Sequence, residues 1–525
     1  MMGGRGSRWV FVLLSIVFTA SCERVPRIPD PEHERLKGHY FFIDRDGYGL
    51  NREAQPVTSE QFDELAQPIL DGLRARAAQQ SKCADGTCRL KVLLFLHGGM
   101  NGYATGVERM RHLVEADPGE RHLPALLSPD SSDYYPIFLN WNSAPLDATG
   151  DDLLSIRFAE RQSWPVVGFT LPFVLIGRTA QTLGNIPVSL VHIGFNIKEG
   201  FMGGIQAGDS YGCTIADAIA YAPMIPFYAV TAPLLEGFGV PAWNIMKRRA
   251  ELAVANRLPG NQHHVLEGAA YTFLRRLLPA LQDLPVPVEL TVVGHSMGSI
   301  LLNRLLPQLQ PSDHVIVRHI VYLAPAINLE EINHYLLPFV RDHAQADVSI
   351  FTLNRRDEAR EVALNGWIFM FPRGSLLTWV DTFFEPASVM EEETAGRIRN
   401  LEEYYACDLK DQPSDVKDCP PSSRRIREPK PPSRWGFTRR PLHATGDLPL
   451  DRVQLFEAVR DLNQNWAPEH HGDFSQPRFL AQALCQVDYG AFKTGVCDEH
   501  LEYYSPAYRE DHTFRICGMP TPFKK

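Results

Sequence analysis

The chain has 525 residues, of which 44% are hydrophobic and 22% are charged, and its formal net charge is −10 at pH 7. This composition is that of a globular protein with enough apolar material for a large core. The negative net charge lacks the excess of basic residues typical of proteins that bind nucleic acid, so we expect no nucleic-acid partner.

The first 22 residues have the pattern of an export signal. Arg5 and Arg8 precede the run WVFVLLSIVFTASC, which has the length of a signal and is too short to span a bilayer. Its end, FTASC, resembles the lipobox of bacterial lipoproteins, in which the cysteine is acylated and becomes the new N-terminus. We therefore predict a signal peptide over residues 1–21, lipid attachment at Cys22 and export to the bacterial cell envelope, on the outer-membrane or periplasmic side. The alternative is an uncleaved N-terminal anchor helix.

The cysteines fit an oxidising compartment. There are nine, so eight remain if Cys22 carries a lipid, an even number that suits disulfides. Short spacings would let three pairs close small loops: Cys83 with Cys88, Cys407 with Cys419, and two of Cys485, Cys497 and Cys517. Zinc-type spacings are missing from the sequence, and we expect neither a metal nor a cofactor.

The predicted elements begin with an edge hairpin and a helix. HYFFIDRDGYGL (39–50) contains an Asp46-Gly47 turn signal and could supply an antiparallel hairpin. Residues 62–73 repeat apolar side chains at helical spacing. Five apolar runs of strand length follow, at 90–97, 135–141, 288–295, 318–326 and 348–354. Because they are continuous and alternate with helical patterns, we predict an α/β fold: a mostly parallel sheet with helices on both faces.

Two segments depart from this alternation and define the expected organisation. Residues 142–287 form an insertion between two strands, and positions 163–246 hold only six charged residues. This apolar insertion could be a lid, a membrane-contacting surface or buried core; prolines argue against a spanning helix at 218–235. The second segment, 386–450, is polar and proline-rich and reads as an arm. We expect an N-terminal segment at 22–88, a core at 89–385 and a returning core part with a cysteine-containing tail at 451–525.

The motif GHSMG lies between a predicted strand and a predicted helix. In this context Gly294, Ser296 and Gly298 fit a nucleophile elbow, in which flanking glycines let strand and helix approach closely around a strained serine. The alternative is a serine that merely caps the helix. Upstream, His97-Gly98-Gly99 ends an early strand, where a backbone N–H could face an oxyanion. We therefore predict Gly99 and Met297 as oxyanion donors.

Together these segments resemble an α/β hydrolase of the lipase and esterase type. The matching pieces are FLHGGMNGYATGVERMRHL, IFLNWNSAP, VVGHSMGSILL, IVYLAPAINL and IFTLNRRDEA, in the order that the family has them. The resemblance implies a catalytic triad in the chain order serine, acid, histidine.

Within this resemblance, Ser296 would be the nucleophile and Asp357, just after a strand, the acid, with Glu358 and Glu361 as rivals. For the base we favour His471, whose following Gly-Asp-Phe resembles the loop around the family's histidine, over its neighbour. The alternatives for the base are His470, His443 and His512.

The resulting hypothesis is a membrane-anchored serine hydrolase that cleaves carboxylic esters. Its partners would be a small-molecule or lipid ester and the membrane, through the N-terminal lipid and the apolar insertion. Two alternatives stay open: a peptidase, amidase or thioesterase on the same fold, or a catalytically silent envelope scaffold that binds lipid or protein.

Overall fold

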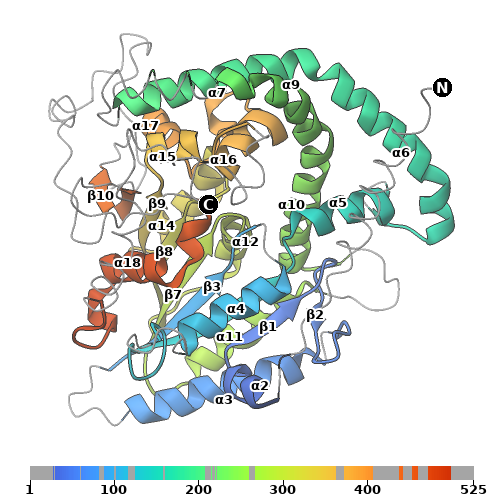
Figure 1. Cartoon of the computed structure of the whole chain (residues 1–525). Coiled ribbons are helices and arrows are strands. Elements are labelled where there is room, and N and C mark those ends of the chain that lie inside the picture. Colours follow the sequence, from blue (N-terminus) through green and yellow to red (C-terminus); the bar gives the residue numbers. More distant parts are fainter. Residues whose placement is uncertain are drawn as a thin grey trace.

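The structure is a computed structural model of the whole chain (Figure 1). It describes residues 28, 30–58, 61–81, 88–99, 102–115, 125–157, 160–206, 215, 219, 222–258, 267–361, 372–405, 437–440, 452–458 and 471–497. The predicted signal peptide, Cys22, His443, His470 and His512 lie outside these residues.

A nine-stranded sheet runs through the molecule in the order β10-β11-β9-β8-β7-β3-β4-β1-β2. The strands are β1 Tyr40–Ile43, β2 Gly49–Leu50, β3 Leu90–Leu96, β4 Tyr134–Trp141, β7 Val288–His295, β8 Val315–Leu323, β9 Asp347–Thr352, β10 Phe437–Arg440 and β11 Val453–Ala458. All pairings from β11 to β1 are parallel, and only the two outermost strands pair antiparallel. The predicted mostly parallel sheet is therefore confirmed.

Helices cover both faces of this sheet (Figure 1). Those of the core are α2 Asp30–Leu36, α3 Phe62–Gln80, α4 Tyr103–Val114, α11 Ala269–Gln282, α12 Gly298–Leu305, α14 Leu337–Asp342, α15 Arg355–Arg360 and α18 Pro477–Val487. α4 contacts α18, whereas α3, α11, α10 (Val240–Val254) and α12 form a continuous row of contacts. Because both faces are covered, the five predicted strands are almost entirely buried, which explains why their sequences are continuously apolar.

The edge hairpin forms where expected, but with mixed pairing. β1 and β2 pair antiparallel around a turn in which Gly47 has φ 88°, a conformation that favours glycine. Asp44 Oδ1 accepts the N–H groups of Asp46 and Tyr48, both at 2.8 Å. β1 itself pairs parallel with β4, so it extends the parallel sheet and only β2 is antiparallel.

The insertion is almost wholly helical. Its elements are α5 Pro145–Leu154, β5 Ile156–Arg157, β6 Glu160–Arg161, α6 Trp164–Gly184, α7 Ile186–Gln206, η1 Ala222–Met224, α9 Ile225–Leu234, η2 Leu235–Gly239 and α10. In the described part of the run 218–235, α9 follows η1 and continues through the π-helical η2 into α10. Among the described residues, α6 is the one helix long and apolar enough to cross a membrane, by length and composition alone.

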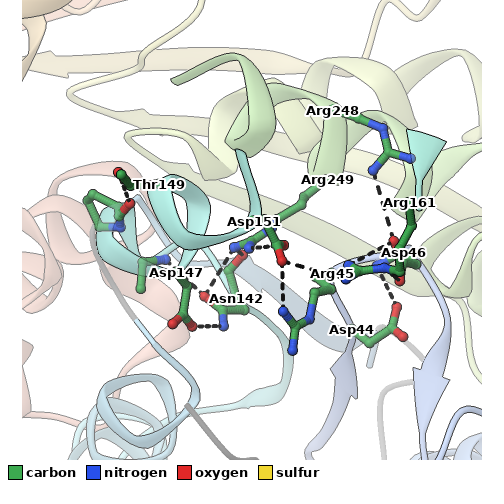
Figure 2. Close-up of polar contacts among 12 residues, drawn as sticks. Asp44, Arg45, Asp46, Asn142, Asp147, Thr149, Asp151, Arg161, Arg248 and Arg249 are labelled. Atoms are coloured by element: carbon green, nitrogen blue, oxygen red, sulfur yellow. Dashed lines mark hydrogen bonds and ion pairs between the residues drawn. The ribbon is translucent and has the colours of Figure 1, made fainter. Parts of the chain in front are cut away.

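A buried ionic network fastens the base of the insertion to the edge hairpin (Figure 2). Asp151 of α5 forms two ion pairs, one with Arg249 Nη2 of α10 and one with Arg45 Nη1 of the hairpin turn, both at 2.8 Å. Arg161 of β6 pairs with Asp46 of the same turn at 2.9 Å. Since Arg249 and Asp151 are both buried, they lose hydration and depend on each other as partners.

The segment read as a polar arm contains regular structure in its described parts. α17 Ile398–Tyr405 presents buried apolar side chains, and β10 pairs with β11 to form the far edge of the sheet. The remaining short elements are α13 Leu329–Glu331, η4 Ile332–Leu336, α16 Leu376–Trp379, η5 Val380–Phe384, η6 Met390–Glu392, η3 Leu306–Gln308, η9 His471–Ser475 and η10 Tyr489–Ala491. A disulfide joins Cys485 of α18 to Cys497, one of the predicted pairings.

Candidate active site

Ser296 occupies the sharp turn between β7 and α12. Its φ of 51° lies in the left-handed region, which a residue other than glycine adopts only where the surroundings hold it. The adjacent end of β8 supplies that hold: Ser296 N–H donates to the carbonyl of Leu323 at 2.9 Å, and Ala326 N–H donates to the carbonyl of Ser296 at 3.1 Å. The strand, turn and helix predicted around GHSMG are therefore present.

The glycines of this turn are needed for close approach. A Cβ on Gly294 would lie 2.9 Å from the Cα of Ser299, and one on Gly298 would lie 2.1 Å from the carbonyl oxygen of Leu96. Both positions touch backbone, which cannot move aside as a flexible side chain could. The two glycines thus let β7, α12 and the end of β3 meet around Ser296.

His471 brings its imidazole directly to the serine. Its Nε2 lies 2.7 Å from Ser296 Oγ, although the two residues are 175 positions apart in the chain. A neutral ring with its proton on Nδ1 accepts the hydroxyl proton through Nε2. Burial lowers the pKa of His471 from 6.5 to about 4, so the ring is neutral at pH 7. The pair therefore has the distance and the protonation state of a nucleophile and its base.

His295, the residue before the serine, supports the histidine loop. Its Nε2 lies 3.3 Å from the carbonyl oxygen of His471, and the two rings lie 5.5 Å apart. Burial, with smaller contributions from His471 and Arg109, holds the pKa of His295 well below its ordinary value. A neutral His295 can donate to that carbonyl without adding a positive charge beside the base.

The carboxyl groups after β9 lie beside the histidine loop but do different things. Asp357 is buried in the first turn of α15, where its Oδ2 accepts Asn354 Nδ2 at 2.7 Å. Glu358 accepts Arg397 Nε at 2.9 Å, which commits it to an ion pair. Glu361 accepts the backbone N–H of His471 at 3.0 Å. Within the described part of the chain, His471 Nδ1 has no hydrogen-bond partner, so the structure does not join Asp357 to it.

Glu361 is buried beside the backbone of the histidine loop. Burial raises the pKa of Glu361 well above its ordinary value; the N–H of His471 opposes this, while nearby Asp473, Glu358 and Asp357 add to it. Glu361 therefore positions the backbone of the histidine loop with its negative charge disfavoured. It is a poor source of negative charge for an imidazolium.

The two predicted oxyanion donors adjoin each other. A Cβ on Gly99 would lie 2.8 Å from Met297 Sδ, and one on Gly98 would lie 2.7 Å from Ser296 Cβ. The loop after β3 thus passes directly over the elbow, where only glycine fits. The structure brings Ser296, His471, Gly99 and Met297 together at the carboxyl ends of β3 and β7.

The carbonyl of Gly98 is held by two donors that the sequence analysis did not identify. Ser143 Oγ donates to it at 2.9 Å, and His97 Nδ1 lies 3.0 Å from it. Trp141 N–H donates to His97 Nε2 at 3.1 Å, which leaves the proton on Nδ1. Because this carbonyl and the N–H of Gly99 belong to one planar peptide, fixing one orients the other. The signal for Ser143 was its place just after β4, the strand beside β3.

Sequence comparison agrees with the geometry. A family model described as alpha/beta hydrolase family matches residues 200–484, more than half of the chain. The matched range contains Ser296, Asp357 and His471, whereas Gly99 lies before it. No curated protein and no solved structure matches the chain.

Proposed function

Because the chain belongs to the alpha/beta hydrolase family, we propose that it is a serine hydrolase that cleaves carboxylic esters, of the esterase or lipase type. One observation carries this proposal: Ser296, held at a φ of 51° in a sharp turn, has its Oγ 2.7 Å from Nε2 of a neutral, buried His471. A helix cap would need neither the strained turn nor the histidine.

The reaction follows from the positions of these groups. His471 takes the proton of Ser296 as the oxygen attacks the ester carbonyl, and then gives a proton to the leaving alcohol. The N–H groups of Gly99 and Met297 stabilise the oxyanion, each contributing about 3 kcal/mol in comparable sites. Water, activated by the same histidine, then releases the acid from Ser296. No step needs a cofactor.

We assign the acid of the triad to Asp357. Of the three carboxyl groups in and just after α15, Glu358 is paired with Arg397, and burial raises the pKa of Glu361 and so disfavours its negative charge; we therefore choose Asp357 to stabilise the imidazolium. Its carboxylate would have to reach His471 Nδ1 when substrate binds, as catalytic hydrogen bonds often tighten only in the substrate complex.

A fluorophosphonate probe tests the nucleophile. We expect one adduct, on Ser296, in the folded wild-type protein and none in Ser296→Ala; absence of the wild-type adduct would favour the silent scaffold. A panel of p-nitrophenyl esters of rising chain length, run beside matched anilides and thioesters, tests the bond that is cleaved. Faster turnover of the anilides or thioesters would replace the ester assignment by amidase or thioesterase.

We further propose that Cys22 carries a lipid that anchors the enzyme in the cell envelope. Support comes from the signal-like run and its FTASC end alone. Metabolic labelling with a palmitate analogue should mark the exported wild-type chain and not Cys22→Ser. Equal labelling of both would contradict the anchor.

A further inference from the structure

The helix α6 carries large apolar side chains on its outward face. Its spacing of four, three and seven residues puts Phe169, Phe173, Ile176 and Leu183 on one face, and all four are exposed, Phe169 by 75%. On the opposite face, its single charged residue, Arg178, pairs with Asp152 of α5 at 3.0 Å. A helix on a water-facing surface normally turns its polar side chains outward, so this exposed apolar face is unusual.

The helix α7 is apolar on both sides: Ile193 packs inward against a hydrophobic cluster, and other apolar side chains face outward. Val188, Val191 and Phe195 are exposed and lie on one face at spacings of three and four residues. Ser189 Oγ donates to the buried Glu236 Oε1 at 2.9 Å, and His192 Nδ1 lies 3.2 Å from the same oxygen. These contacts fasten α7 to η2, while the outward faces of α6 and α7 carry large apolar side chains.

Both ends of α6 are fastened to the rest of the molecule. Arg161, just before the helix, pairs with Asp46 of the edge hairpin, and Thr182 packs against Gly237 of η2. α7 follows after one residue, and Figure 1 shows both helices along the outer rim, away from the sheet. A helix of 21 residues is about 31 Å long, but one held at both ends lies along the protein and does not cross a bilayer.

We propose that the outer faces of α6 and α7 form a membrane-docking surface that lies in the plane of a lipid bilayer, with the side chains from Phe169 to Phe195 inserted among the acyl chains. The backbone of both segments is helical, so its polar groups are satisfied in an apolar medium. Trp164, exposed at the start of α6, suits the headgroup level. The chain carries a net charge of −10, so apolar insertion rather than attraction to anionic lipid drives this docking.

A second copy of the chain is a less suitable occupant than lipid. The exposed large apolar side chains follow two successive helices along the rim, and the two helices together carry few charged groups for a specific protein contact. A bilayer requires no such groups. It accepts apolar side chains at any register.

The surface is joined to the candidate active site. α7 packs against α15, the helix that carries Asp357, and against η5. Docking would therefore set the site beside the membrane, which suits an ester whose acyl chain is dissolved there. This last step rests on the proposed function, whereas the docking itself does not.

Tryptophan fluorescence tests the surface at a defined position. Phe173→Trp and, as the control, Val389→Trp place the probe at exposed apolar residues on and off the surface, 65% and 54% exposed respectively. Both variants carry Ser296→Ala, so the outcome is independent of catalysis. With vesicles of brominated phosphatidylcholine, we expect added quenching for the probe at 173 and none at 389, unchanged by high salt. Equal quenching at both positions, or none at 173, would overturn the proposal.

A second variant separates this surface from an N-terminal anchor. In a full-length Cys22→Ser chain, replacing Phe169, Phe173 and Ile176 by serine should lower partitioning into phosphatidylcholine vesicles by at least about tenfold. The serines face outward, so circular dichroism should stay unchanged. If partitioning is unchanged, or if the substitutions instead convert a dimer to a monomer in lipid-free buffer, the docking surface is wrong.

Discussion

Glu361 Oε2 accepts the backbone N–H of His471 at 3.0 Å, while His471 Nε2 faces Ser296 Oγ at 2.7 Å. One carboxyl group thus positions the main chain of the base, and we propose that a different one, Asp357, stabilises its charge. The two acids after β9 have different surroundings: Glu361 holds the histidine loop and burial raises its pKa, whereas Asp357 accepts Asn354 Nδ2.

Asp357→Asn and Glu361→Gln form a matched pair of substitutions. If Asp357 stabilises the imidazolium, Asp357→Asn removes the negative charge and should lower kcat by about 10⁴-fold, as in other serine triads. Glu361→Gln keeps an oxygen that can accept the His471 N–H and removes only a charge that burial already disfavours, so we expect a loss below about tenfold. Steady-state kinetics on a soluble ester measures both, with circular dichroism to verify folding. A larger loss of kcat in Glu361→Gln than in Asp357→Asn would assign the acid of the triad to Glu361.

The pH dependence should report the buried base. His471 acts when neutral, and burial lowers its pKa from 6.5 to about 4. Activity is therefore present above that pKa and is lost as pH falls through about 4. We expect kcat/KM for a short ester to stay level from pH 7 to 5.5 and to reach half of its plateau near pH 4, after correction for the folded fraction. A midpoint near 6.5 would show that the ring is solvated in the working enzyme.

The features that could be predicted from the sequence are those that depend on a few consecutive residues. β3, β4, β7, β8 and β9 are continuous apolar runs because both faces of the sheet are covered, and the elbow is five consecutive residues. β11 and β10 were missed. β10 lies within the polar segment and forms a strand because it pairs with β11 at the sheet edge. Such a pairing cannot be predicted from the local sequence.

The site divides in the same way. Ser296, Met297 and Gly99 follow from local motifs, and His471 from a loop that resembles the family's. The contact of Ser143 with Gly98 exists only because β4 lies beside β3, and the raised pKa of Glu361 comes from its burial, with a smaller contribution from three other carboxyl groups folded around it. Such properties come from long-range packing, so spacing along the chain could not reveal them.

Ser143 should act as a positioning residue for the oxyanion donor. Ser143→Ala removes one of the two donors on the Gly98 carbonyl and leaves His97, so the Gly99 N–H should be aimed less well. We expect kcat to fall by about tenfold, less than the 10²- to 10³-fold typical of losing an oxyanion donor, with little change in KM. Ser128→Ala, whose hydroxyl contacts Ser131 instead, is the control. A change confined to KM, or an equal effect of the control, would contradict this role.

Two glycine substitutions should have opposite effects on stability because their surroundings differ. At Gly298 an added Cβ would lie 2.1 Å from the carbonyl oxygen of Leu96 and 2.7 Å from that of His97. At Gly177, within α6, nothing lies within 4 Å of it. Gly298→Ala must push β3 and α12 apart beside the nucleophile, whereas Gly177→Ala should stabilise its exposed helix by up to about 1 kcal/mol.

Thermal unfolding and ester turnover measure both effects. We expect Gly298→Ala to lower Tm and to abolish turnover even in the fraction that stays folded, because the elbow can no longer hold Ser296 against His471. Gly177→Ala should keep full turnover on a soluble ester with an equal or slightly higher Tm. A fully active Gly298→Ala would mean that the elbow tolerates a wider turn, and that the close contact of β3 with α12 is not what sets the serine in place.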